Sequence, residues 1–154
     1  SAAQQGRTGA LDDAAANDGF NLVTQQTAEW NAEKAQQIVQ SVIDAGTPFN
    51  VIYAENDDMA KGAVAALDKA NISHGVGKDV IVMGFDCNKW ALEELKAGNW
   101  NYDGQCNPFQ ASYIDDIIKK LESGETISEK TIIMDEKGFD ATTITQEDVD
   151  NYGI

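Results

Sequence analysis

A chain of 154 residues with 42% hydrophobic residues is long enough to form one globular domain with a buried core. Its 26 acidic and 11 basic residues give a formal net charge of −15, which repels both phosphate backbones and anionic lipid. We therefore expect no nucleic-acid partner. No apolar run approaches the roughly 18 residues that suggest a membrane span.

The first half of the chain alternates between helical and strand-like patterns. In order, it predicts a helix over 1–17, a strand over 20–23, a helix over 32–45, a strand over 49–54 and a helix capped by Asn56 or Asp57. Ala3, Ala10, Leu11, Ala14 and Ala15 are expected to face the core from the first helix. Since no strand precedes that helix, we expect that a central strand is missing and that the chain was cut from something longer.

The second half continues the alternation. It predicts a loop over 71–78, a strand over 80–85, a short helix from Asn88 to Gly98, a strand over 100–103, a helix over 108–123, a strand over 131–134 and a polar tail with only short extended pieces. Strand–helix units of about thirty residues are typical of right-handed crossovers. The predicted fold is therefore α/β, with a doubly wound, mostly parallel sheet flanked by helices.

Polar residues follow the apolar strands where each strand ends. Asn56 follows one strand and Asp86 follows the next, and both positions lie at the carboxyl edge where open α/β sheets bind ligands. The same edge is expected to collect Arg7, Trp30 and Gln105. Amides, a carboxylate and a guanidinium together suit the recognition of hydroxyl groups, and an indole offers a flat apolar face to a sugar ring. The pattern predicts a polar small-molecule site.

Each of these residues also has a purely structural explanation. Asn56 can serve only as an N-cap, and Asp86 can cap the helix that begins near Asn88. Arg7 can be a solvated charge, and Trp30 an anchor in the core or a loop. The convergence of all of them on one predicted edge favours a binding site.

Signals of catalysis are weak. The single histidine, His74, lies in a Ser-His-Gly-Val-Gly loop and is interpreted as a surface residue. The chain has no Gly-x-Ser-x-Gly elbow, no phosphate-binding loop and no dinucleotide fingerprint. We therefore predict no enzyme activity, no cofactor and no metal. Four acidic pairs on predicted helices are interpreted as solvated charges: Asp12-Asp13, Asp57-Asp58, Glu93-Glu94 and Asp115-Asp116.

Two cysteines, Cys87 and Cys106, each follow a predicted strand end. They make neither a disulfide framework nor a zinc site. A disulfide between them is geometrically feasible, and two separate thiols are the alternative.

Three motifs carry a resemblance to a known family. Ala54-Glu-Asn-Asp-Asp-Met-Ala-Lys-Gly-Ala63, Gly84-Phe-Asp86 and Gln105-Cys-Asn-Pro108 resemble the periplasmic sugar-binding proteins of ABC importers, of the ribose- and galactose-binding type. The similarity runs from Ser1 to about Thr143. It implies non-catalytic binding of a monosaccharide, with contacts from Arg7, Trp30, Asn56, Asp86 and Gln105, and from Asn107 as a close alternative to Gln105.

The resemblance also implies a domain organisation. Residues 1–105 match the second lobe of a two-lobed protein without its opening strand, 106–134 match a segment of the first lobe, and 135–154 return to the second lobe. The apolar face of the 108–123 helix, formed by Ile114, Ile117, Ile118 and Leu121, would then lack its usual partner. We expect this face to pack differently, to pair with a second copy, or to meet a separate first-lobe chain.

The implied partners are a pentose or hexose and the membrane subunits of an ABC importer. The implied location is periplasmic or extracellular, with a lipid anchor as an option for the full-length form. The chain shows no signal peptide, and a mature or truncated chain would also lack one. Ala3 stands where the galactose-binding branch has an acid, which disfavours a close glucose/galactose-type site. The alternatives are the sugar-sensing domain of a repressor and an α/β enzyme acting on a sugar.

Overall fold

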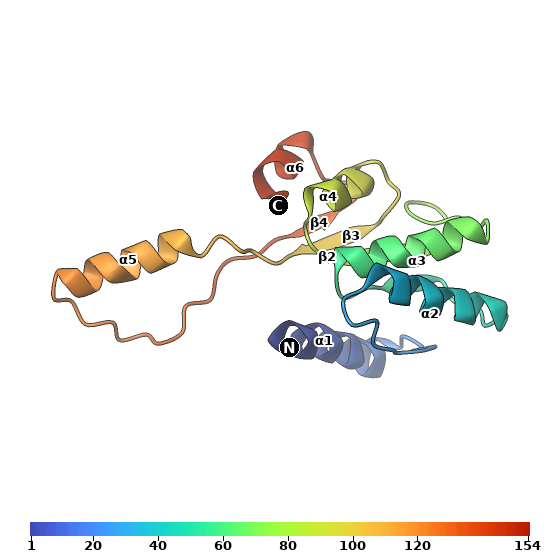
Figure 1. Cartoon of the computed structure of the whole chain (residues 1–154), viewed down its shortest axis with the longest axis horizontal. Coiled ribbons are helices and arrows are strands. Elements are labelled where there is room, and N and C mark those ends of the chain that lie inside the picture. Colours follow the sequence, from blue (N-terminus) through green and yellow to red (C-terminus); the bar gives the residue numbers. More distant parts are fainter.

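A small sheet with helices packed against it and one long projecting arm make up the molecule (Figure 1). The computed structural model describes all 154 residues. In chain order the elements are α1 (Ala2–Asp18), α2 (Ala32–Asp44), β1 (Val51–Tyr53), α3 (Asp57–Lys69), β2 (Ile81–Asp86), α4 (Lys89–Lys96), β3 (Tyr102–Gln105), α5 (Ala111–Glu122), β4 (Gly138–Asp140) and α6 (Gln146–Tyr152). No helix combines the length and the apolarity needed to cross a membrane.

The sheet has four strands in the order β1-β2-β3-β4. The first three strands are parallel, and β4 runs antiparallel to β3. The register places Asp86 directly opposite Gln105, so the ends of β2 and β3 coincide. The prediction of an α/β fold with a mostly parallel sheet flanked by helices is confirmed.

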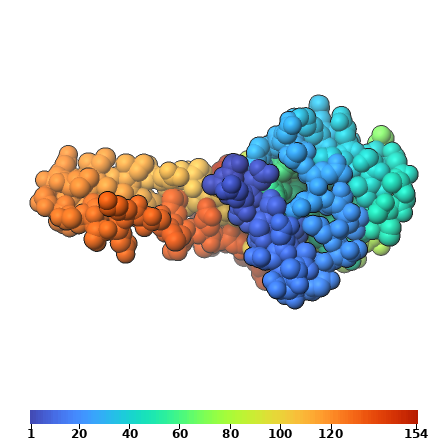
Figure 2. Space-filling model, turned by 90° about the horizontal axis from the view of Figure 1, so that it is seen from below, coloured from blue at the N-terminus to red at the C-terminus, as the bar shows by residue number.

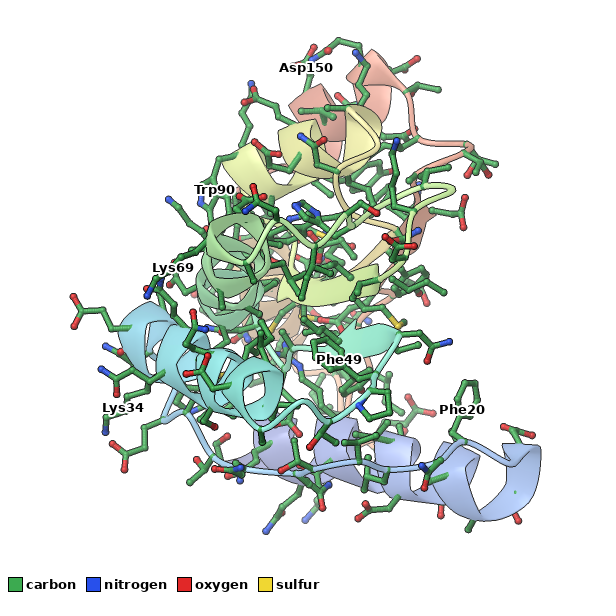
Figure 3. The ribbon with its side chains drawn as sticks, turned by 90° about the vertical axis from the view of Figure 1, so that its right-hand side faces the viewer. Phe20, Lys34, Phe49, Lys69, Trp90 and Asp150 are labelled. Carbon is green, nitrogen blue, oxygen red and sulfur yellow. The ribbon has the colours of Figure 1, made fainter.

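The core lies between the sheet and the helices that connect its strands. Its largest fully buried side chains include Trp100, Leu67, Leu92 and Leu95. Trp100 packs edge-on against Trp90 of α4, with ring centroids 5.9 Å apart. Trp90 lies between α4 and α3 (Figure 3) and has Lys61 of α3 over its ring. Aromatic and aliphatic packing thus fixes α3 and α4 against the sheet.

Helices α2 and α3 pack against each other more closely than ordinary side chains allow. A Cβ atom on Gly62 of α3 would lie 2.0 Å from the carbonyl oxygen of Ala32. Position 62 therefore requires glycine, and the contact brings α2 directly onto α3 along one side of the sheet (Figure 3).

Two predicted strands are absent. Phe20–Val23 is separated from β1 by a groove of about 360 Å³, whose walls include Phe20, Leu22, Phe49 and Ile52. Its backbone makes no hydrogen bond to another strand. Thr131–Met134 lies on the projecting arm, where Ile133 is 88% exposed. Both segments have β-forming side chains but no neighbouring strand, and a strand exists only through its partner.

The tail contains more structure than predicted. One of its short extended pieces is β4, which pairs with β3. The helix α6 was missed, although Thr145 and Asp148 form a reciprocal capping box at its start. Val149 of α6 is fully buried in the core. The Thr-x-x-Asp spacing carries this signal in the sequence.

Helix α1 is less buried than predicted. None of its residues is fully buried. Leu11, Ala14 and Ala15 are half-buried as expected, whereas Ala3 and Ala10 are exposed. The helix therefore lies against the rest of the molecule through a narrow contact rather than through a full apolar face.

The segment between β3 and β4 projects from the body as an arm that carries α5 (Figures 1 and 2). Ile114, Ile118 and Leu121 on the apolar face of α5 are 52%, 48% and 56% exposed. The expectation that this face packs differently within the same chain is therefore wrong. A second copy and a first-lobe chain remain as candidate partners.

Hydrogen exchange will show whether the α5 face is covered in solution. Helix α5 has no buried residue, while α3 has six, so in the isolated chain the amides of α5 should exchange at least about tenfold faster. The measurement is amide exchange followed by mass spectrometry, with α3 as the internal reference. Equal protection of both helices would mean that something covers α5.

Candidate functional site

The carboxyl ends of β1, β2 and β3 form one continuous edge, which we call the strand-end edge. β1 is followed by Ala54, Glu55 and Asn56, and β2 and β3 end at Asp86 and Gln105. Parallel pairing aligns these ends, as the sequence predicted. Helix α1 brings Arg7 onto the same edge.

Arg7 is the central contact of the strand-end edge. Its Nη2 donates to Oδ1 of Asp86 at 3.0 Å, and its Nη1 donates to the carbonyl oxygen of Glu55. The guanidinium also lies over the ring of Phe85, 4.8 Å from its centroid. Tyr53 donates its hydroxyl to the carbonyl of Arg7 at 3.0 Å. Because the Arg7 side chain is only 12% exposed, its interpretation as a solvated charge is wrong.

Asp86 sits at a strained corner. Asp86 and Cys87 both have positive φ, 116° and 62°, a region that residues with side chains seldom adopt. Burial raises the pKa of Asp86, while the hydrogen bond and charge of Arg7 oppose that rise and nearby Asp58 adds to it. The Arg7 pair therefore helps to keep Asp86 ionised and available as an acceptor.

Asn56 performs the capping role that was its structural alternative. Its Oδ1 accepts from the backbone N–H of Met59 at 2.9 Å, and the residue is 8% exposed. The cap occupies the oxygen, but the Nδ2 group makes no hydrogen bond within the chain. One side chain can thus cap α3 and still donate to a ligand.

Gln105 and Asn107 are held in different ways. The Oε1 of Gln105 accepts from the backbone N–H of Lys137 at 3.2 Å, which ties the end of β3 to the segment before β4. Asn107 lies beyond the edge, where its Oδ1 accepts from Phe109 and its own N–H donates to Glu136. The structure shows no contact between Asn107 and Arg7 or Asp86. It shapes the start of the arm.

Trp30 lies beside the Arg7 pair and is open to solvent. The residue is 40% exposed, and Cζ of Arg7 lies 6.0 Å from its ring centroid. A left-handed backbone at Trp30, with φ of 61°, turns the chain just before the Asn31 cap of α2. The structure therefore brings Arg7, Asp86 and Trp30 together, and places Asn56 and Gln105 on the same edge.

Sequence reasoning missed Phe85 and Glu55. Phe85 stacks under Arg7 and meets Tyr53 edge-on at 5.3 Å, so it forms the apolar floor of the edge. Its signal was visible, because an aromatic residue directly precedes Asp86 at the strand end. Glu55 accepts the hydroxyl of Thr8 and thereby joins β1 to α1. No pattern in the sequence singled out that pair.

Two further interpretations are corrected. Asp57 is fully buried rather than solvated, and its Oδ2 accepts from the backbone N–H and the side-chain Nδ2 of Asn88 at 2.8 and 3.0 Å. His74 is not a surface residue: its side chain is 12% exposed and contacts the carbonyl of Asn99 and the carboxylate of Asp68. The ring joins two loops.

The cysteines are separate thiols. Cys87 is buried and Cys106 is exposed, and neither is bonded to the other. Burial raises the pKa of the Cys87 thiol well above its ordinary value, so it is an inert core residue. No group of three or more His, Cys, Asp or Glu side chains is arranged to hold a metal ion.

The fold is that of α/β proteins, in which ligands bind at the carboxyl ends of parallel strands. The match to known families agrees: the chain belongs to the periplasmic binding protein family, whose domain model, described as a periplasmic binding protein domain, matches residues 1–125. This confirms the resemblance to the sugar-binding proteins of ABC importers.

Curated relatives cover most of this chain but are much longer. The fructose import binding protein of Bifidobacterium longum is 31% identical over 132 residues, which cover 84% of this chain and 38% of the relative. The putative rhizopine-binding protein of Rhizobium meliloti is 31% identical over 131 residues, which cover 82% of this chain and 41% of the relative. The chain thus spans about two fifths of the length of these relatives.

Solved structures share the fold. An ABC transporter periplasmic solute-binding protein from Actinobacillus succinogenes with bound D-allose has a TM-score of 0.77 at 28% identity, covering 97% of this chain and 50% of that one. A protein from Mycobacterium smegmatis in complex with β-D-fucofuranose has a TM-score of 0.73 at 26% identity, covering 88% and 44%. The fructose and rhizopine relatives and the protein with D-allose are named as binding proteins.

A double-mutant cycle will test the Arg7–Asp86 pair. Arg7→Gln, Asp86→Asn and the double variant should give a coupling energy of about 1 kcal/mol in urea unfolding, because the two side chains are only 12% and 28% exposed. The matched control is Lys89–Asp150, whose side chains are 52% and 56% exposed and should couple by less than about 0.5 kcal/mol. Equal coupling in both pairs would contradict a special role for Arg7.

Proposed function

We propose that this chain is the ligand-binding part of a solute-binding protein of an ABC importer, and that it binds a monosaccharide without catalysing a reaction. The observation that carries the proposal is the Arg7–Asp86 pair, stacked on Phe85 at the strand-end edge and flanked by the exposed ring of Trp30. The family membership and the sugars named for its relatives support it.

The chemistry of the edge suits a hydroxylated ligand. Asp86 can accept from ligand hydroxyls while Arg7 donates to their oxygens, and the free Nδ2 of Asn56 adds a donor. Trp30 offers its face to the C–H groups of a sugar ring. Gln105 is proposed to complete the set, with Asn107 as the alternative nearest to the arm. Closure of a second lobe over this edge would remove water and strengthen every polar contact.

The sugar is proposed to be a pentose or a hexose outside the glucose/galactose type. Relatives are named for fructose and rhizopine, and solved relatives hold D-allose and β-D-fucofuranose. The proposed setting follows from the family: delivery to the membrane subunits of an importer, in the periplasm or at the cell surface, with a lipid anchor as an option for a full-length form.

The arm supports the proposed domain organisation. Residues 106–134 are assigned to a first lobe, with 1–105 and 135–154 forming the second. The exposed face of α5 supports this assignment, because an amphipathic helix is stabilised mainly by burying its apolar side. We propose that a first lobe covers this face, and that the groove beside β1 receives a further strand. Pairing of α5 with a second copy is the competing outcome.

A sugar titration tests the proposed site. Two-dimensional NMR with a panel of pentoses and hexoses at millimolar concentration should shift signals at Arg7, Trp30, Asn56 and Asp86 for one sugar. Asn56→Ala and Asp86→Ala should each weaken binding about tenfold or more, because each loses a hydrogen-bond partner of the ligand. Asp150→Ala, at an exposed site on α6, is the control. Unchanged affinity in both site variants would remove these residues from the site.

Sedimentation velocity will show what covers α5. If a first lobe is its partner, the isolated chain should sediment as a monomer near its mass of 16.6 kDa, and Ile118→Asp should leave that mass unchanged. A dimer that Ile118→Asp dissociates would instead establish the second copy. High salt belongs in the test, because the net charge of −15 opposes self-association.

A further inference from the structure

Two carboxyl groups lie buried directly behind the strand-end edge. Asp57, in the first turn of α3, and Asp103, in β3, are both 0% exposed, and Asp103 is in register with Gly84, which lies against the Asp57 carboxyl. One Asp57 oxygen accepts from both donors of Asn88. The other Asp57 oxygen and both Asp103 oxygens lack a donor of ordinary geometry in the rest of the chain. Gly84 makes room for the pair, since a Cβ there would lie 2.7 Å from Oδ1 of Asp57.

No cation compensates the two carboxyls. The residues that act on them are acidic or neutral: Asp86 and Cys87 face the pair from the end of β2, and Asn88 donates to it. On its other side, Asp103 is paired in register with Phe139 of β4. Arg7 of α1 is bonded to Asp86 and to a backbone carbonyl, and Asp58 of α3 acts on Asp86. Two neighbouring buried carboxylates cannot both be ionised in such surroundings.

We propose that Asp57 and Asp103 share one proton, and that this shared proton holds the corner carrying Asp86 in its binding position. Asp103 donates to the unpartnered oxygen of Asp57, which leaves Asp57 ionised and able to accept both donors of Asn88. The corner at Asp86 and Cys87 has positive φ at both residues, and such a backbone persists only where its surroundings fix it. Asp57 is thus a positioning residue and Asp103 is its proton donor.

The position of Asp57 in the chain extends its influence to both sides of the site. It directly follows Asn56, and through Asn88 it holds the loop that follows Asp86. The two strand ends that present the proposed ligand contacts are therefore clamped by one buried carboxylate. The consequence for ligand affinity rests on the proposed function, whereas the shared proton and the clamp do not.

The shared proton makes the fold sensitive to pH in a defined direction. Burial, followed by the charge of Asp57, raises the pKa of Asp103 to about 9, and burial raises the pKa of Asp57 to about 6. An unfolded chain releases these protons near pH 4. Between that pH and about 9 the folded chain holds a proton that the unfolded chain has lost, so stability falls as pH rises through this window.

The first test measures stability against pH for the wild type and for Asp103→Asn. One proton held only by the folded chain raises the unfolding constant by up to about tenfold per pH unit. We expect this rise for the wild type between pH 6 and 9 relative to Asp103→Asn, whose amide can donate to Asp57 without titrating. Asp140→Asn, at an exposed carboxyl on β4, is the matched control and should follow the wild type. Parallel wild-type and Asp103→Asn profiles would overturn the shared proton.

The second test reads the clamp itself. The carbon resonances of the Asp57 and Asp103 carboxyls and the amide signals of Asn88 and Cys87 should move together in wild-type chain between pH 6 and 9.5. In Asp103→Asn the amide signals should stay fixed at their low-pH positions, and in Asp103→Leu, which has no donor, they should be displaced at every pH. Carboxyl titration without movement of the Asn88 amide would overturn the positioning role.

A third measurement tests whether the shared proton affects ligand binding. For any sugar that the chain binds, the dissociation constant should rise from pH 6 to 9.5 in the wild type and stay flat in Asp103→Asn. Flat profiles in both proteins would overturn the link between the proton and the site. If no sugar binds, the proposed function fails, while the stability and NMR readouts still decide whether the proton and the clamp exist.

Discussion

The guanidinium of Arg7 is the contact on which the site depends, because helix α1 has so little else to hold it. No residue of α1 is fully buried, and yet the helix must bring a cation to the ends of two strands. Arg7 does this through polar bonds to Asp86 and to the backbone beside Glu55, and through stacking on Phe85. Thr8 and the hydroxyl of Tyr53 add two more polar ties. Helix α1 is therefore held in place largely by the same Arg7 contacts that form the candidate site.

The two sides of the sheet are completed to different degrees. On the β4 side, α6 buries Val149 and packs beside α4 (Figure 1). On the β1 side, a groove separates the strand from Phe20–Val23. The arm leaves the sheet after β3, and it carries α5 away from the body (Figure 2). Open hydrogen-bonding edges and exposed apolar helix faces are the features that a protein normally covers. The molecule thus leaves two apolar surfaces uncovered, the groove beside β1 and the face of α5 on the arm.

Local patterns in the sequence predicted most of what local forces decide. The Asn56 cap and the apolar periods of α2, α3 and α5 follow from interactions within a few residues, and all of them are present in the structure. The failures concern partners distant in the chain. Phe20–Val23 and Thr131–Met134 have strand-forming side chains, but a strand also needs a neighbour, and composition does not provide one. Phe85 was visible as an aromatic residue at a strand end, but its stacking depends on an arginine 78 positions earlier.

Asp57 shows a different limit of sequence reasoning. Two adjacent aspartates at the start of a helix look like solvated charges that favour the helix dipole, and Asp58 is exposed as expected. Asp57, the preceding residue, instead points into the core and accepts from Asn88, a residue 31 positions later. Burying a carboxylate costs free energy unless donors surround it, so such a group is stable only where several bonds converge.

That convergence explains why the buried acid lies where it does. The ends of β1 and β2 must stay in register for Asn56 and Asp86 to face a common ligand, yet the corner after β2 has an unfavourable backbone at two successive residues. Apolar packing alone resists separation of the two ends but is weakly directional. Hydrogen bonds from both Asn88 donors to one carboxylate fix distance and orientation together. Burial of Asp57 behind the strand-end edge is costly, but its two hydrogen bonds with Asn88 supply the directional contact that apolar packing does not.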